Sequence, residues 1–342
     1  MILSARHPLV LAPGRMTLAQ LKLIHQEQQF IALPESCRSD IRKSQALVEA
    51  YADGDTPVYG VNTGFGKLAN QRINKEQLHT LQLNLIRSHS VGVGEPLSAP
   101  IIRLMMATKA ASLARGYSGV REIVIDTLLA VHNAGLVPDV PSQGSVGASG
   151  DLAPLAHMTL SLLGEGYIWV SGIKIPALEA LKEAGIAPLT LEAKEGLALI
   201  NGTQTSTALA LHALFSFEPV FEAGLVIGAL TIDAARGSDG PFDARIHELR
   251  GQLGQIKVAQ VYRNLLIGSE IRNSHREGDD RVQDAVARRR HGRGQAARMD
   301  GQAGRRGEAR PGRRGGRDRQ GRDRRRDPRA LVPRCASKLR IF

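Results

Sequence analysis

Apolar residues recur at three- and four-residue spacing along most of residues 17–271, which is the pattern of helices that bury one face. Leu18, Leu21 and Ile24 form such a face directly after Thr17, a residue type that caps helix N-termini. Capping residues, prolines and glycines bound similar segments further along the chain. The pattern predicts helices over residues 18–26, 39–52, 74 to at least 86, 98–115 and 120–133, and again from 202 to about 271 with a break near 237–241.

Signals for β-strands are scarce. Residues 167–170 and 173–175 flank Ser171 and Gly172 and predict one small hairpin. No internal repeat is evident. The predicted fold class is mainly α, with long packed helices whose connecting loops carry the glycines.

The formal charge of +12 comes from the C-terminal tail. Residues 285–342 carry 20 Lys and Arg against 5 Asp and Glu, whereas residues 1–284 carry 25 against 28. Between Arg288 and Ala330 the only large apolar residue is Met299, so this segment cannot bury enough surface to offset its chain entropy. We therefore divide the chain into a near-neutral globular body, residues 1–284, and an Arg/Gly-rich tail, residues 285–342, that is predicted to be disordered.

The cysteine count and the N-terminus bear on the compartment. Cys37 and Cys335 are too few for a disulfide framework and fit a reducing environment. The apolar start of the chain is too short for a signal peptide and is interrupted by Arg6 and His7, and no uncharged apolar run approaches a membrane span. We expect a cytoplasmic protein without a membrane partner.

Four glycine-containing segments interrupt the helical pattern, at residues 58–70, 87–96, 143–158 and 195–206. The third contains the small residues Gly144, Gly147, Ala148, Ser149 and Gly150, directly before a helix that starts at Asp151. Taken alone, this segment favours a tight loop in which Ser149 or Asp151 caps the helix. A phosphate-binding loop is the weaker alternative, because the Walker spacing and a preceding strand are missing.

The string GSVGASGDLAPLAH (144–157) resembles the signature of the aromatic amino-acid ammonia-lyases, and the likeness extends over nearly all of residues 8–284. In that family an Ala-Ser-Gly triplet loses two waters and cyclises to a 4-methylidene-imidazol-5-one group. The resemblance implies that Ala148, Ser149 and Gly150 form this electrophile autocatalytically, without an external cofactor or metal. The residue types suit the chemistry, because Gly150 offers an unhindered nitrogen and Ser149 a β-hydroxyl that can leave. It also implies a long-helix bundle of the fumarase/aspartase type.

Two further residues take their roles from the resemblance. Tyr59, in VYGVNTGFG, matches the family's catalytic tyrosine, which removes the β-proton of the substrate. Without the flanking glycines it would be interpreted as a half-buried core tyrosine hydrogen-bonded at its tip. Asn201, in LINGTQ, matches an asparagine that hydrogen-bonds around the electrophile and substrate, although an Asn-Gly pair usually means a turn.

The substrate is indicated by Ser88 and His89, which resemble the pattern of the histidine-specific members, where a polar pocket can hydrogen-bond an imidazole. The stretch GSEIRNSHREGDDRVQD (268–284) also resembles the bacterial histidine enzymes, and it carries Gln283, a substrate-binding candidate. Otherwise His89 would be a structural histidine and the charged stretch a solvated connection.

The resemblance ends after Asp284. The family continues with YSLRCQPQ, whereas Val286 and a run of arginines follow here, so the carboxylate-binding role of the family's arginine is not transferred to Arg289. The later family helices are missing as well. We expect a reading-frame change near residue 285, which resequencing would test. Because family members form homotetramers with shared active sites, the chain as written is expected to be poorly soluble, with little or no activity.

The resemblance therefore implies a lyase of the histidine ammonia-lyase type, which converts L-histidine to urocanate and ammonia in the first step of histidine degradation. The alternatives are a tyrosine or phenylalanine ammonia-lyase or aminomutase, an inactive fragment, or a non-catalytic scaffold. A nucleic-acid binder is disfavoured, because the tail between Ala285 and Ile341 has no aromatic residues for stacking on bases.

Overall fold

The computed structural model describes residues 7–65, 71–147 and 149–275. These residues divide into two compact units, 7–215 and 216–275. Ala148, Gln283, Arg289 and the predicted tail lie outside the described residues, so the division at residue 284 and the disorder of the tail stay predictions.

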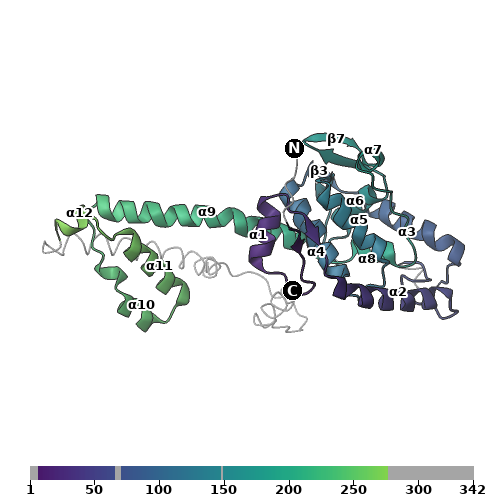
Figure 1. The fold of residues 1–342 in the computed structure, drawn as a ribbon, viewed down its shortest axis with the longest axis horizontal. Coiled ribbons are helices and arrows are strands. Elements are labelled where there is room, and N and C mark those ends of the chain that lie inside the picture. Colours follow the sequence, from purple (N-terminus) through teal and green to yellow (C-terminus); the bar gives the residue numbers. More distant parts are fainter. Residues whose placement is uncertain (1–6, 66–70, 148, 276–342) are drawn as a thin grey trace, which may run out of the picture. The chain divides into compact units, whose positions relative to one another are not determined.

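The first unit is built mainly from helices, and the five helices predicted at its N-terminal end are confirmed (Figure 1). Thr17 caps the first of them through a capping box: its hydroxyl accepts from the Gln20 N–H at 3.3 Å, while the Gln20 side chain accepts from the Thr17 N–H at 3.0 Å. The helices are α1 (Leu18–Gln26), α2 (Arg38–Asp53), α3 (Lys75–His89), α4 (Ala99–Leu113), α5 (Glu122–Asn133), α6 (Leu152–Leu162), α7 (Ala177–Glu183), α8 (Glu195–Ile200), the first part of α9 (Gln204–Ala234) and a short 3-10 turn (Glu35–Cys37).

Helix α4 forms the centre of this unit. Eleven of its fifteen residues are buried, and it packs against α1, α5 and the strand β4. The buried series includes the charged residue Lys109. Helix α8 packs against α3 and α6, so the chain segment just before Asn201 also lies within the helical core.

Within the described residues, seven short strands form three small sheets. The hairpin is confirmed as β6 (Tyr167–Val170) and β7 (Ile173–Pro176), and β4 (Val137–Pro138) adds a third strand to it. Two further pairs were not predicted: β1 (Leu9–Val10) with β2 (Ile31–Ala32), and β3 (Val93–Pro96) with β5 (Pro141–Gln143). Three of these strands have only two or three residues, and β3 (VGEP) has no alternation of apolar and polar residues, so none of the four could be recognised in the sequence.

The second unit, residues 216–275, is helical as predicted, with the expected break at residues 237–241. It contains the remainder of α9, a 3-10 turn (Gly240–Phe242), α10 (Ala244–Arg250), α11 (Leu253–Leu265) and α12 (Glu270–Asn273). Ala229, Ile232 and Leu266 form its small apolar cluster. Phe242 stacks on Tyr262 beside this cluster, with ring centroids 4.8 Å apart.

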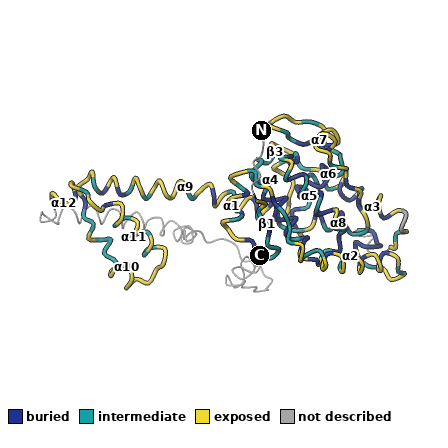
Figure 2. Tube along the Cα trace, viewed as in Figure 1, coloured by how far each residue is buried: buried dark blue, intermediate teal, exposed yellow. Residues whose placement is uncertain are grey.

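Helix α9 exposes an unusual amount of apolar surface. Phe217, Val220, Ile227 and Leu230 are each at least 60% exposed, and Figure 2 shows mostly intermediate and exposed positions along the helix. The segment from Glu195 to Ala234 contains the one stretch, among described residues, that by length and composition alone could cross a membrane. Core helices of soluble proteins also meet that criterion.

Candidate active site

The triplet loop adopts a strained conformation against the chain at Gly202. Ser149 has a φ of 64° and Gly150 a φ of 140°, both in the region that side chains disfavour. A β-carbon at residue 150 would lie 2.7 Å from the carbonyl oxygen of Gly202 and 2.9 Å from its nitrogen. Only glycine fits this contact. Glycine also offers the unhindered backbone nitrogen that the cyclisation requires. The described part of the loop therefore suits the methylidene-imidazolone group.

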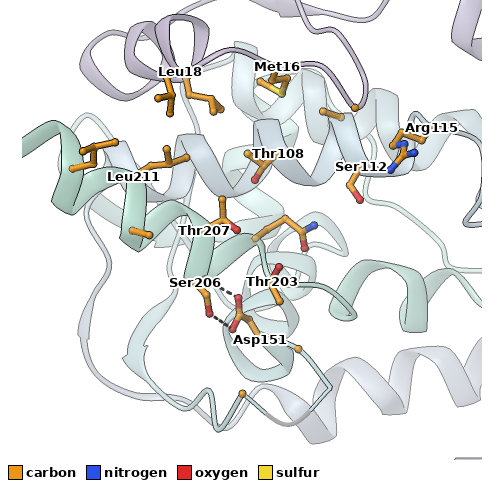
Figure 3. A pocket seen from close by; sticks show the side chains of 18 residues that line it. Met16, Leu18, Thr108, Ser112, Arg115, Asp151, Thr203, Ser206, Thr207 and Leu211 are labelled. Carbon is orange, nitrogen blue, oxygen red and sulfur yellow. Dashed lines mark hydrogen bonds between the residues drawn. The ribbon is translucent and has the colours of Figure 1, made fainter. Parts of the chain in front are cut away.

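Asp151 ties this loop to the start of α9. Its side chain is 2% exposed, and its carboxylate accepts from the N–H of Ser206 at 2.7 Å and from the Ser206 hydroxyl at 2.6 Å (Figure 3). The Ser145 hydroxyl donates to the same carboxylate at 3.2 Å. Asp151 is the N-cap residue of α6, one of the two expected, but its side chain makes no capping hydrogen bond there and instead accepts the Ser206 N–H in the first turn of α9.

Asn201 lies at the end of α8, beside the triplet loop. Its backbone N–H completes the helix by donating to Leu197 at 3.0 Å, and its carbonyl accepts from the Lys109 ammonium at 2.6 Å. The next residue, Gly202, accepts the N–H of Asp151 at 2.8 Å. The structure therefore places Asn201 next to Gly202, the residue that contacts Gly150, and Asn201 itself is exposed.

Tyr59 lies in a loop that packs against Leu197 of α8, the helix that ends just before Asn201. A β-carbon at Gly60, which has a φ of 74°, would lie 2.2 Å from a methyl group of Leu197. The Tyr59 ring is 55% exposed and meets the edge of Phe65 at 5.9 Å between centroids. With more than half of its surface exposed, Tyr59 is not a residue of the hydrophobic core.

The loop around Tyr59 is held by Asn62, a residue that the sequence did not single out. The Asn62 side chain is fully buried; it accepts from Val58 at 2.7 Å and donates to the carbonyls of Tyr51 at 2.9 Å and Thr56 at 3.0 Å. A buried amide with three backbone partners rigidifies an irregular loop. In the sequence, Asn62 is marked only as an asparagine in a glycine-flanked segment. That pattern is too common to identify a residue with a structural role.

Ser88 and His89 lie at the C-terminal end of α3. The Nδ1 atom of His89 is 2.8 Å from the Leu85 carbonyl, and because a carbonyl can only accept, Nδ1 carries the proton. The Ser88 hydroxyl donates to the same carbonyl at 3.0 Å. In the neutral ring the Nε2 atom of His89 is then the acceptor that remains for a ligand.

The unpredicted pairing of β3 with β5 joins the segment after His89 to the segment before the triplet, with Val93 opposite Gln143. Between them, the N–H of Gly92 donates to Nε2 of His157 at 2.9 Å. Burial lowers the pKa of His157, which keeps the imidazole neutral and able to accept. His157 is the last residue of the motif GSVGASGDLAPLAH, but the motif alone does not indicate a role for it.

A cavity of about 750 Å³ lies between α1, α4 and the first turns of α9 (Figure 3). Gly150 and Asp151 border it, but Tyr59, His89 and Asn201 do not. The predicted substrate-binding side chains therefore lie outside this cavity, and Gln283 is not among the described residues. Within the described ranges, no group of three or more His, Cys, Asp or Glu side chains could hold a metal ion.

Comparison with known proteins gives a consistent result. The sequence model of the family described as aromatic amino acid lyase matches residues 16–293. A histidine ammonia-lyase of Burkholderia pseudomallei (strain 668) is 56% identical over 282 residues, which are 82% of this chain and 55% of that protein. The chain thus spans about half the length of the curated relatives it matches.

Solved structures agree. The crystal structure of histidine ammonia-lyase from Trypanosoma cruzi is 37% identical, with a TM-score of 0.69, covering 74% of this chain and 49% of that one. The tyrosine aminomutase of Streptomyces globisporus is 36% identical, with a TM-score of 0.72, covering 76% of this chain and 49% of that one. Together with the family model, these relatives show that the chain belongs to the aromatic amino acid lyase family.

Proposed function

We propose that this chain is the N-terminal catalytic region of a histidine ammonia-lyase, an enzyme that eliminates ammonia from L-histidine to give urocanate. The observation that carries the proposal is the contact of Gly150 with the backbone of Gly202, in a loop where Ser149 also has a positive φ. Such a loop is already bent towards a tight ring, and the relatives named histidine ammonia-lyase support the substrate.

The cofactor in this proposal is 4-methylidene-imidazol-5-one, formed from Ala148, Ser149 and Gly150. When formed, it supplies an electrophilic carbon that makes the amino group of the substrate a better leaving group. The chain's own part in forming it is to hold Gly150 against Gly202, where the backbone leaves no room for a side chain.

The remaining candidates act on the substrate. Tyr59 removes the β-proton, and the exposure of its side chain supports this role, because a base must be accessible to the substrate. Nε2 of His89 accepts the N–H of the substrate imidazole, with Ser88 beside it, whereas a phenyl ring offers no such donor. Asn201 supplies an exposed amide, and Gln283 binds substrate from outside the described residues.

The proposed assembly is a homotetramer in the cytoplasm. The exposed apolar residues of α9 support it, because surfaces of this kind are usually covered by other subunits. The residues after Asp284 differ from the family's sequence pattern, so this chain is expected to have little turnover of its own.

The test has two arms. In the first, the peptide spanning residues 148–150 is weighed after expression of the 342-residue chain; loss of two waters supports the proposal, and Ser149→Ala is the control that cannot lose them. In the second, a frame-corrected protein is assayed with histidine, tyrosine and phenylalanine. We expect a preference for histidine, and loss of the activity in Tyr59→Phe. Preference for tyrosine would refute the role of His89.

A further inference from the structure

Lys109 is a charged side chain in the middle of the apolar core. It belongs to α4 and is only 1% exposed. Burial lowers the pKa of its ammonium to about 7, because the surrounding core disfavours the charged form. A methionine would fill a similar volume without this desolvation cost, so packing alone does not account for a lysine here.

The end of the side chain reaches the candidate site. The Lys109 ammonium donates to the carbonyl of Asn201 at 2.6 Å, across 92 positions in sequence. The peptide that follows this carbonyl leads into Gly202, whose own carbonyl accepts the N–H of Asp151 at 2.8 Å and touches the position of Gly150. Lys109 therefore holds one end of the Asn201–Gly202 segment, which lies against Gly150 of the triplet loop.

The charged neighbour of Lys109 is Asp151, whose negative charge favours the ammonium form. Their side chains form no ion pair within 4 Å in the part of the chain that the structure describes, since the Asp151 carboxylate takes its hydrogen bonds from Ser145 and Ser206. The directed bond of Lys109 is thus the one to Asn201, and it acts on backbone geometry.

We propose that Lys109 is a positioning residue for maturation: it fixes the Asn201–Gly202 peptide against Gly150, so that the triplet loop is held in the conformation that closes the ring. This inference rests on the proposed function, because it concerns how the electrophile forms. Lys109 touches neither the substrate nor the reacting atoms, and its effect passes through Gly202.

The experiment measures the rate at which newly made 342-residue chain loses two waters from the peptide spanning residues 148–150. Lys109→Met removes the donor and is expected to slow this loss by about 10- to 100-fold, the scale of small misplacements of reacting groups. Lys109→Arg keeps a charged donor and is expected to restore most of the rate. Thr108→Val is the matched control, because the Thr108 hydroxyl is buried on the same helix but bonds only to Leu104 and Met105 of that helix.

Unchanged maturation in Lys109→Met, or equal slowing in Thr108→Val, overturns the inference. If the wild-type chain itself never loses water, the proposed function fails and the inference that rests on it fails too, whereas maturation of the wild type together with unchanged maturation in Lys109→Met overturns the role of Lys109 alone. If Lys109→Met does not fold, the ratio of the wild-type rate to the Lys109→Arg rate decides. As pH rises through about 7 the lysine loses its charge while arginine keeps it, so the ratio should fall several-fold, and a constant ratio would refute the proposal.

Discussion

Replacing Asp151 with alanine should destabilise the first unit measurably. The buried carboxylate is the common acceptor of three hydrogen bonds, from the Ser206 N–H at 2.7 Å, the Ser206 hydroxyl at 2.6 Å and the Ser145 hydroxyl at 3.2 Å. The first of these satisfies a backbone donor in the opening turn of α9, which no residue of that helix can satisfy.

The magnitude follows from these contacts. Loss of a helix cap of this kind costs about 1 kcal/mol. A hydrogen bond to a charged group is worth about 1.5–3 kcal/mol, but Ser145 and Ser206 are exposed and water can replace part of it. We expect a total loss of about 3 kcal/mol in Asp151→Ala, and about half of that in Asp151→Asn, which keeps one acceptor oxygen.

The assay is urea unfolding followed by the fluorescence of Trp169, the only tryptophan of the chain, which lies in β6 of the same unit. All variants carry Ser149→Ala, so that maturation cannot differ between them. Ser206→Ala and the double variant complete a thermodynamic cycle, in which the hydroxyl contact should appear as a coupling of about 1–2 kcal/mol. A loss below about 0.5 kcal/mol in Asp151→Ala would show that the carboxylate does not anchor α9.

Three further predictions concern stability. Burial lowers the pKa of His132 to about 4, below the value of about 6.5 in the unfolded chain. Because the unfolded state therefore binds the extra proton, the free energy of unfolding should fall by about 2 kcal/mol from pH 7 to pH 5. The His132→Gln variant should lose less over that interval in the same urea assay. Gly119→Ala should cost about 1–3 kcal/mol, because φ is 68° and the new carbon would lie 2.2 Å from Val48; adding Val48→Ala should recover part of the loss, and no recovery would contradict the steric reason. Glu195→Ala should lower the free energy of unfolding by about 3–5 kcal/mol, because it leaves the Arg121 guanidinium without its buried partner. A midpoint of thermal unfolding equal to that of the wild type would contradict this value.

The helices were largely predictable because their ends are marked locally. Thr17, Asn74 and Ser98 precede the helices that the spacing predicts, and Gly54 and Gly135 follow two of them. The strands β3 and β5 were missed, since each is held by its partner rather than by any alternation of its own. That pairing lies beside the candidate site, so the sequence located the motifs but not the connection between two of them.

The site shows the same division. Tyr59, Asn201 and the triplet could be selected by motif, whereas the role of Asp151 at α9 could not, because its partner Ser206 is 55 residues away. Lys109 is harder still. Within the apolar run of α4, a lysine suggests a position where the side chain reaches solvent, and only the tertiary contact with Asn201 reveals that its charged end is in the core.

The triplet lies far along the chain from Gly202 and Ser206, the residues that hold its loop, and this distance has a consequence for biosynthesis. Gly150 leaves the ribosome before Gly202 and Ser206 have been made, so the loop is at first an ordinary, uncompressed peptide. At about 5–20 residues per second, the interval of 55 residues lasts roughly 3–11 s. Under the proposed function, the electrophile therefore cannot begin to form while the triplet is emerging, and a nascent chain that stops before residue 206 would remain chemically inert however long it survived.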